Sequence, residues 1–470
     1  MSEKIQVQRI RDPLHDLIEF STSKSELERV LWDVVQTRPF QRLRRVKQLG
    51  FSEMIYPGAS HTRFAHSLGV FHTARHLMGV VKRDKATNEE SKEVRALAAA
   101  LVHDLGHGPF SHAFEDVGKR LSLKFADHEE MSNVLIREGE VASELNKMGS
   151  GFASDVADII RKDGVKSVQH AVVSSQFDAD RLDYIRRDRM MSGTQHAAID
   201  FNWLINNLRV ASVPVGVDDK QTGSIETFVL DSKASFAAEA YVLGLFQLYP
   251  TIYFHKATRG IEKLYTEIIV RIVELVREGD WKKVGLPIGH PLIIFAKSPD
   301  KIEAALNLDD TVFWGSLSIL ANSKDSLIAE FSKRIRDRKI FSWVDIRAQV
   351  AHKLDPETLN TDEMIEKIDR CCAEIAAKIY DLNSTVVNKV NHVLVDKAER
   401  SPYKSVSESK GPLDRINIFT AGGNLVDLKE RSPVVASLKK FKLFRAYYSR
   451  ENGDAEKLIT DIVEGVTQDA

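Results

Sequence analysis

Apolar residues recur at intervals of three and four through most of the chain, the spacing that places them on one face of an α-helix. On this pattern we expect helices over 67–81, 93–105, 114–121, 128–137, 156–161, 179–191, 201–208, 235–254 and 259–277. A short strand is expected over 225–231, and apolar segments near the C-terminus predict a hairpin at Gly422-Gly423 and a last strand over 441–449. The predicted fold is therefore mainly α, with a helical core and a smaller α+β C-terminal region.

Glycine and proline gather between residues 278 and 300, where they occupy Gly279, Gly285, Pro287, Gly289, Pro291 and Pro299. Because both residue types interrupt helices, this segment predicts the end of the helical core. We expect a first domain over 1–277, a linker over 278–300 and a C-terminal α+β region over 301–470. In that region a helical block over 301–383 precedes the strands, and 401–410 is expected to be an exposed loop.

The 470 residues carry 66 basic and 67 acidic side chains, so bulk charge does not indicate a protein that coats nucleic acid. Local basic clusters keep nucleic acid open as a partner. No apolar run reaches the roughly 20 residues that span a bilayer, and the first ten residues lack the apolar core of a signal peptide. Cys371 and Cys372 are neighbours on a predicted helix, where their side chains point apart and disfavour a disulfide. We therefore expect a cytoplasmic protein without membrane contact.

The dipeptide His103-Asp104 ends a run of apolar helix-forming residues that begins at Ala96. Burying an imidazole beside a carboxylate costs several kcal/mol unless both groups are hydrogen-bonded, paired or bound to a metal. Eight of the fifteen histidines lie between residues 61 and 128, which favours a site over scattered core polar groups. Imidazole and carboxylate ligands together suit Mn, Fe, Zn, Ni or Co. The candidate ligands of one such divalent ion are His66, His103, Asp104 and Asp180.

Three segments resemble the motifs of HD-domain phosphohydrolases: RFAHSLGV over 63–70, HDLGHGPFSH over 103–112 and DADRLDYIRRD over 178–188. Further matches at 11–16, 38–50, 56–61 and 253–260 extend the resemblance over residues 8–275. Within the family the chain is most similar to the deoxynucleoside triphosphate triphosphohydrolases. The resemblance implies an HD-domain helical core and metal-dependent hydrolysis of a deoxynucleotide to deoxynucleoside and triphosphate, with Mg²⁺ left open as a companion of the substrate phosphates.

The resemblance also assigns roles to residues by their places in these motifs. His107, His112, Glu115 and His128 match residues that act at the scissile phosphate. Three residues apart on a helix, His112 and Glu115 share a face and can form an oriented acid/base pair, whereas His128 is equally suited to the start of a helix. The implied substrate contacts are Arg63, Arg181, Tyr184 and Lys256 for the phosphates, Gln48 and Asp188 for the sugar 3′-hydroxyl, and Leu49 and Tyr253 for exclusion of a ribose 2′-hydroxyl. A plain helix aromatic is the competing interpretation of Tyr253.

Several positions depart from the family pattern. Arg181 stands where the family usually has Lys, and Leu245 stands where nucleotide-activated members have Arg. Ser342 stands where those members have a Lys that follows an Arg and binds the activator phosphates. Gln36 replaces the Asp with which they recognise an activating guanine, although the neighbouring Gln41 and Arg44 match the family. We therefore expect activity that does not strictly require guanosine triphosphate, with another nucleotide effector, or none. Members of the family commonly place nucleotide-binding surfaces between subunits, so a homo-oligomer of at least two chains is expected.

Two other functions remain open from the sequence. One is an HD-type phosphodiesterase or nuclease on single-stranded nucleic acid, which basic and aromatic residues along a groove would favour. The other is a nucleotide sensor that binds without turnover and signals through its C-terminal half. The set of His112, Glu115 and His128 weighs against the sensor.

Overall fold

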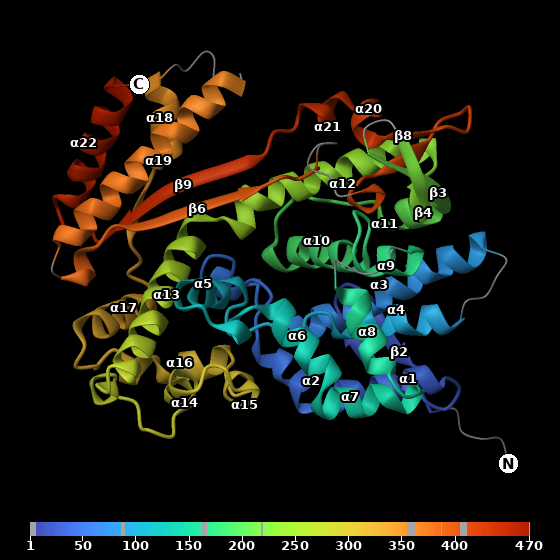
Figure 1. The fold of residues 1–470 in the computed structure, drawn as a ribbon, viewed down its shortest axis with the longest axis horizontal. Helices are drawn as coiled ribbons and strands as arrows, with labels where there is room; N and C mark the ends of the chain where they lie inside the picture. The colour runs from blue at the N-terminus through green and yellow to red at the C-terminus, as the bar shows by residue number, and fades with distance from the viewer. Residues whose placement is uncertain are drawn as a thin grey trace. The chain divides into compact units, whose positions relative to one another are not determined.

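The computed structural model describes residues 6–85, 90–161, 167–217, 220–354, 362–386, 388–404 and 411–469. The chain forms two compact units that alternate along the sequence. Unit 1 comprises Met1–Ile252, Pro299–Thr311 and Ser401–Lys439, and unit 2 comprises Tyr253–Ser298, Val312–Arg400 and Lys440–Ala470. The prediction of a mainly α fold is confirmed (Figure 1). The division into domains over 1–277 and 301–470 with a linker stays a prediction, and part of the loop expected over 401–410 lies outside the described residues.

Unit 1 holds most of the helices. They are α1 (Glu26–Gln36), α2 (Arg38–Arg42), α3 (Arg63–Asp84), α4 (Glu90–Val102), α5 (His112–Leu121), α6 (His128–Arg137), α7 (Gly139–Leu145), α8 (Phe152–Ile160), α9 (Val168–Val173), α10 (Ala179–Ser192), α11 (Phe201–Asn207), α12 (Ser235–Leu248), α15 (Ile302–Leu306), α20 (Leu428–Arg431) and α21 (Pro433–Ser437). Side-chain caps begin several of them, because the oxygens of Ser25, Asp127 and Asp178 accept backbone N–H groups at the starts of α1, α6 and α10.

Helix α4 forms the centre of unit 1 and packs against α3, α8 and α9. Every residue from Ala96 to Val102 is buried, and four of these seven are alanines, which allow neighbouring helices to approach closely. Helix α3 is also largely buried, mainly through large apolar side chains such as those of Phe64, Leu68 and Phe71. The two helices therefore supply a rigid base for the polar groups at their ends.

Two small sheets complete unit 1. The first pairs β1 (Gln8–Asp12) with β2 (Asp16–Phe20) as a hairpin. The second has the order β3 (Leu208–Val217), β4 (Lys220–Leu230), β7 (Asn417–Phe419) and β8 (Leu425–Asp427), with β4 and β7 parallel and the other neighbours antiparallel. The hairpin predicted at Gly422-Gly423 is confirmed as β7–β8.

Unit 2 combines helices with one sheet. Its helices are α13 (Lys256–Arg277), α14 (Pro291–Lys297), α16 (Asp310–Leu320, which begins in unit 1), α17 (Ser326–Arg336), α18 (Ile346–Leu354), α19 (Asp362–Thr385) and α22 (Ala455–Gln468). The antiparallel strands β5 (Ser342–Asp345), β9 (Phe441–Tyr448) and β6 (Leu394–Arg400) form its sheet, with β9 in the centre. The two cysteines are buried and unbonded in α19. Among the described helices, none is long and apolar enough to cross a membrane.

Some predicted boundaries differ from the structure. The helix expected over 93–105 ends at Val102, and residues 103–106 form a turn. The apolar pattern continued past the helix end because Leu105 is buried within the turn, so the predicted helix was too long. Strand β3 was not among the expected elements; it contains Pro214, which is tolerated because β3 is at an edge of its sheet. The helix expected over 235–254 is α-helical to Leu248 and continues as a π-helix over Tyr249–Tyr253, where Pro250 has no N–H to donate to the α-helical bond pattern. Within 278–300, Pro291 begins α14 instead of interrupting it.

Candidate active site

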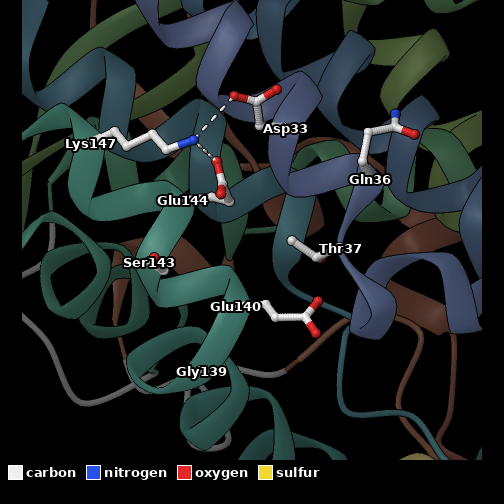
Figure 2. Close-up of a pocket in the computed structure, with 8 residues that line it drawn as sticks. All are labelled: Asp33, Gln36, Thr37, Gly139, Glu140, Ser143, Glu144 and Lys147. Atoms are coloured by element: carbon white, nitrogen blue, oxygen red, sulfur yellow. Dashed lines mark hydrogen bonds and ion pairs between the residues drawn. The ribbon is translucent and has the colours of Figure 1, made fainter.

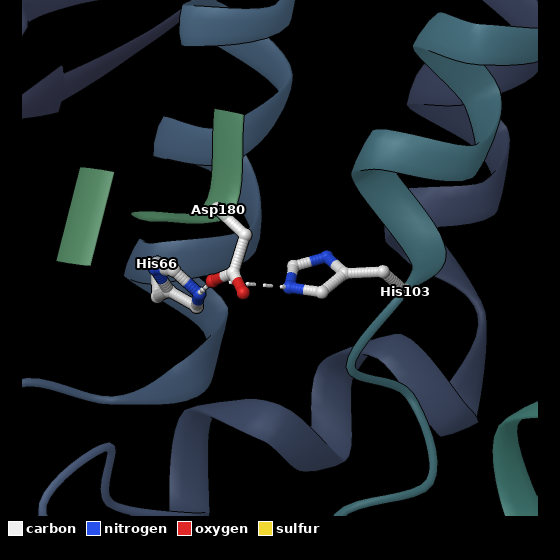
Figure 3. A group of neighbouring side chains, drawn as sticks. All are labelled: His66, His103 and Asp180. Carbon is white, nitrogen blue, oxygen red and sulfur yellow. Dashed lines mark hydrogen bonds and ion pairs between the residues drawn. The ribbon is translucent and has the colours of Figure 1, made fainter. Parts of the chain in front are cut away.

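Three segments of unit 1 bring His66, His103 and Asp180 together, with one ligand atom of each within 4.8 Å of the others (Figure 3). His66 lies in the first turn of α3, His103 follows the last residue of α4, and Asp180 lies in the first turn of α10. Asp104 is beside them, with its carboxylate oxygens 3.7 Å from His66 Nε2 and 3.3 Å from His103 Nε2. The structure thus gathers all four residues that the sequence singled out as metal ligands.

The hydrogen bonds of the two histidines fit a bound transition metal. Nδ1 of His66 lies 2.9 Å from Asp183 Oδ2, and Nδ1 of His103 lies 3.0 Å from the carbonyl oxygen of Ala100. Because these oxygens accept the Nδ1 protons, Nε2 is the nitrogen of each ring that faces the ligand group, and Nε2 of His66 lies 3.0 Å from Oδ1 of Asp180. A metal ion bound there would take the place of the Nε2 proton. Nε2 of His103 is buried between two carboxylates, with Oδ1 of Asp104 at 3.3 Å and Oδ1 of Asp180 at 3.8 Å. A metal ion would satisfy this atom together with the carboxylates.

The carboxylates favour positive charge at this point. Burial alone would lower the pKa of His66, but hydrogen bonds to Asp180 and Asp183 outweigh burial and raise the pKa to about 10. Burial alone would raise the pKa of Asp104, yet Arg63 and His103 hold it well below its usual range. The group is therefore built around ionised oxygens, as a site for a divalent cation requires.

Behind the metal group lies a buried ion network that the sequence did not reveal. Asp183 accepts a hydrogen bond from His15 Nε2 at 2.7 Å and from Arg187 Nε at 2.8 Å, in addition to that from His66. Arg187 also donates to Asp12 at 2.8 Å, and its side chain has no exposed surface. Burial alone would raise the pKa of Asp183, but Arg187 and His15 hold it well below its usual range. Asp183 is thus an ionised partner that fixes the orientation of His66.

Gly69 allows this network to lie against α3. A Cβ atom at this position would be 2.1 Å from Oδ1 of Asp183 and 2.3 Å from a guanidinium nitrogen of Arg187. Neither partner can move without loss of a buried ion pair. The sequence held a signal for this buried ion network. Asp180, Asp183 and Arg187 are spaced to share one face of a helix, and Gly69 lies one helical turn after His66.

A second group of histidines and a carboxylate lies next to the first. His107, Glu115 and His128 offer ligand atoms within 4.8 Å of one another. Oε1 of Glu115 accepts hydrogen bonds from Nδ1 of His112 at 3.2 Å and Nδ1 of His128 at 2.5 Å. The rings of His107 and His128 stack with centroids 4.1 Å apart. Asp104 joins the two groups, since its Oδ1 lies 3.4 Å from His107 Nε2.

The protonation of this second group follows from its contacts. Burial alone would raise the pKa of Glu115, but the hydrogen bonds from His112 and His128 reverse this and hold the pKa well below its usual range. Burial, with Arg63 and His128 nearby, holds the pKa of His107 well below its usual range. Glu115 is therefore an ionised carboxylate that orients two imidazoles, of which His112 is the more exposed.

The residues expected at the phosphates have protein partners. Arg63 is buried and donates to Asp104 Oδ2 at 2.5 Å and to Ser111 Oγ at 2.8 Å. Arg181 donates to Gln176 Oε1 at 2.5 Å. Gln176 is itself fixed by the carbonyl oxygens of Leu413 and Asp414, which accept its backbone and side-chain N–H groups. Tyr184 follows Arg181 by one helical turn on α10, and burial holds the pKa of its hydroxyl well above the usual range.

The residues expected at the sugar lie in two neighbouring segments. Asp188 is buried, and its Oδ1 accepts a hydrogen bond from Nε2 of His61 at 2.7 Å. The backbone N–H of Gln48 donates to the carbonyl oxygen of His61 at 3.1 Å, which brings Gln48 to the same place. Oε1 of Gln48 is buried without a hydrogen-bond partner among the described residues, so it is available to a ligand hydroxyl. Leu49 directly follows Gln48 and is half-buried.

Tyr253 and Lys256 belong to unit 2. Nζ of Lys256 lies over the ring of Trp343, 4.4 Å from its centroid, and Tyr253 is half-buried at the end of the turn that follows α12. Their roles in sugar and phosphate recognition therefore stay predictions. Leu245, where activated family members have Arg, is buried in α12 and offers no charge.

Gln36 lines an open pocket of about 680 Å³ between α1 and α7. Figure 2 shows this pocket, in which Nζ of Lys147 lies between the carboxylates of Asp33 and Glu144. The remaining lining residues are Thr37, Gly139, Glu140 and Ser143. Gln36 thus lines an open surface pocket that shares no residue with the two histidine groups.

Comparison with known proteins agrees with this geometry. The family model described as "HD domain" matches residues 63–185. The chain is 28% identical over 452 residues to the uncharacterised protein YwfO of Bacillus subtilis, covering 94% of this chain and 92% of that protein. It is 30% identical over 319 residues to the uncharacterised protein MG461 of Mycoplasma genitalium, covering 63% of this chain and 70% of that protein.

A third relative carries an activity in its name. The chain is 26% identical over 485 residues to the deoxynucleoside triphosphate triphosphohydrolase SAMHD1 of Mus musculus, covering 94% of this chain and 68% of that protein. Among solved structures, a phosphohydrolase of Bacteroides thetaiotaomicron matches with a TM-score of 0.70 and 28% identity, covering 94% of this chain and 100% of that one. The protein therefore belongs to the HD-domain phosphohydrolases and is an enzyme of that class.

Proposed function

We propose that this phosphohydrolase converts a deoxynucleoside triphosphate to a deoxynucleoside and inorganic triphosphate. The observation that carries the proposal is the direct junction of the two histidine groups through Asp104, which lies 3.3 Å from His103 and 3.4 Å from His107. A ligand site for one metal ion thereby adjoins an oriented set of imidazoles. The similarity to a mouse enzyme named for this reaction supports the choice of substrate.

The reaction exchanges one bond for another at the α-phosphorus. The oxygen of water adds to this phosphorus and water gives up one proton, the bond to the sugar O5′ breaks, and O5′ takes one proton to become the hydroxyl of the deoxynucleoside, so the number of protons is unchanged. When bound at His66, His103, Asp104 and Asp180, a divalent transition metal supplies Lewis acidity for the phosphate oxygens.

The second histidine group handles the proton in this proposal. His112 is the exposed member and is held by Glu115, so it is placed to donate a proton to O5′. His128 shares the same carboxylate oxygen and keeps Glu115 ionised. His107 remains neutral beside Asp104 and stacks on His128, which fixes both rings.

The remaining polar groups bind the substrate. We assign Arg181, Tyr184 and Arg63 to the phosphates, with Lys256 as a further cation for the outer phosphates. We assign Gln48 and Asp188 to the 3′-hydroxyl, and we assign Leu49 and Tyr253 to the exclusion of a 2′-hydroxyl. A site built to hydrogen-bond one hydroxyl and to exclude another discriminates strongly between sugars.

Incubation of the purified protein with each of the four deoxynucleoside triphosphates and Mn²⁺, followed by separation of the products, tests the proposal. Deoxynucleoside and triphosphate in equal amounts are expected. Glu115→Gln should lower kcat by roughly 10²–10⁴-fold, whereas Glu130→Gln, at an exposed position of α6, should leave kcat unchanged. Cleavage of single-stranded nucleic acid in place of nucleotides, or nucleotide binding without turnover, would contradict the proposal.

A further inference from the structure

The backbone directly before α5 is strained. Phe110 has φ of 55° and Ser111 has φ of 54°, so two consecutive residues with side chains occupy the left-handed region. Such residues persist only where the surrounding structure holds them in place. The next residue is His112, the first residue of α5 and the proposed proton donor. The position of this imidazole therefore depends on whatever fixes the strained turn.

Asp310 holds this turn from a distant part of the sequence. Its Oδ1 accepts the backbone N–H of Phe110 at 2.7 Å, and its Oδ2 accepts the backbone N–H of Lys47 at 2.9 Å. The side chain is buried, with 2% of the residue exposed. Both carboxylate oxygens thus act as acceptors, each for a backbone donor of a different segment.

The second donor belongs to the segment proposed to contact the sugar. Lys47 directly precedes Gln48, and its carbonyl oxygen accepts a hydrogen bond from Ser111 Oγ at 3.0 Å. Ser111 Oγ in turn accepts from Arg63 Nε. The turn before His112 and the segment before Gln48 are therefore joined twice, once directly and once through Asp310.

We propose that Asp310 is a positioning residue that sets the distance between the proton-donating His112 and the sugar-contacting Gln48. The inference rests on the proposed function for the roles of those two residues. A carboxylate suits this position because each N–H needs an acceptor, and an amide would present a donor to one of them. The adjacent carboxylate, Asp309, points elsewhere and pairs with the half-exposed Arg45 at 2.6 Å.

Asp310→Asn, an isosteric change, tests the proposal in the full-length protein loaded with Mn²⁺. At pH 8, kcat should fall roughly 10- to 100-fold, since a shift of about 1 Å in a catalytic group has an effect of this size. Bound Mn²⁺ should be unchanged, and KM should change less than kcat. Asp309→Asn is the matched control and should keep kcat within about twofold, because the carboxylate of Asp309 accepts from Arg45 and Thr311, whereas the N–H of Phe110 in the strained turn is bonded to Asp310.

Amide hydrogen exchange separates positioning from the catalytic assignment. Peptides that cover residues 106–114 should exchange faster in Asp310→Asn and at the wild-type rate in Asp309→Asn. Unchanged exchange together with unchanged kcat would overturn the proposal. If the wild type hydrolyses no deoxynucleotide, the proposed function fails, while the exchange rates still decide whether Asp310 holds the turn.

If Asp310→Asn does not fold, hydrogen exchange of the wild type alone tests whether Asp310 holds the turn. The amides of Phe110 and Lys47 must then exchange slowly, as hydrogen-bonded donors do. Exchange of either amide at the rate of an open loop would show that the carboxylate does not hold it, and would overturn the proposal.

Discussion

Nδ1 of His66 donates a hydrogen bond to Oδ2 of Asp183 over 2.9 Å, inside a site where Asp183 has no exposed surface. A carboxylate behind a metal-binding imidazole fixes the ring and raises its basicity, and loss of such a partner typically weakens metal binding 10- to 100-fold. The network of Asp183, Arg187 and Asp12 therefore belongs to the metal site, although none of the three is a proposed ligand.

Asp183→Asn should weaken the binding of Mn²⁺ by about 10- to 100-fold, because the amide cannot accept as strongly from His66 and leaves Arg187 with less negative charge. Calorimetric titration of the metal-free protein measures this. The His103→Ala, Asp104→Ala double variant should bind almost no metal, and Asp158→Asn, an exposed pair with Arg137, should bind normally. Undiminished occupancy in the double variant would refute the assignment of the ligands.

The stability of the protein should depend on pH through Asp310. Burial, with Asp309 nearby, raises its pKa to about 7, although the N–H groups of Phe110 and Lys47 and the charge of Lys47 lower it. Because this folded-state pKa exceeds the unfolded value of 3.8, the group destabilises the fold once it ionises. The contribution of Asp310 to the free energy of unfolding is most favourable below pH 4. It declines by up to about 4 kcal/mol as the pH rises to 7.

The comparison with Asp310→Asn isolates this contribution, because the amide does not titrate. Urea unfolding at half-unit intervals between pH 4 and 7 should show that the wild type loses stability relative to the variant as the pH rises. A constant difference between the two proteins across this range would show that Asp310 does not titrate there.

The choice of sugar provides a test of Tyr253. We predict that deoxynucleotides are preferred and that Tyr253→Ala admits ribonucleotides, because removal of the ring leaves space for the 2′-hydroxyl. The ratio of kcat/KM for deoxy- and ribonucleotides measures this preference in both proteins. Tyr380→Ala is a suitable control, since Tyr380 is an exposed aromatic on α19. Equal rates on both sugars in the wild type would refute the prediction.

The state of assembly and the need for an activator can be measured together. We expect at least two chains per particle, as is common in the family. We also expect turnover that does not strictly require guanosine triphosphate, because the neutral amide of Gln36 stands where a carboxylate would accept the guanine edge hydrogens, and an amide can satisfy other bases. Light scattering and assays with and without added nucleotides measure both properties. A fully active monomer, or turnover that begins only when guanosine triphosphate is supplied, would contradict the expectation.

The sequence predicted those parts of the site that depend on local spacing. His112 and Glu115 are three residues apart on one helix, so their hydrogen bond could be expected. His66, His103 and Asp180 each lie beside a helix end marked by its own motif. Asp310 could not be connected with Phe110, because 200 residues separate them and their bond depends on tertiary packing. Strand β3 was not predicted either, and its place at the edge of its sheet, which accommodates Pro214, is a property of the tertiary fold.

The central claim is attack by water at the α-phosphorus, and hydrolysis in H₂¹⁸O tests it most directly. With Mn²⁺ and a deoxynucleoside triphosphate, mass spectrometry should find one ¹⁸O atom in the inorganic triphosphate and none in the 5′-hydroxyl of the deoxynucleoside. Such labelling would show that the bond between the α-phosphorus and O5′ is the one that breaks. Deoxynucleoside monophosphate and pyrophosphate as the only products, with the label in either of them, would contradict the account.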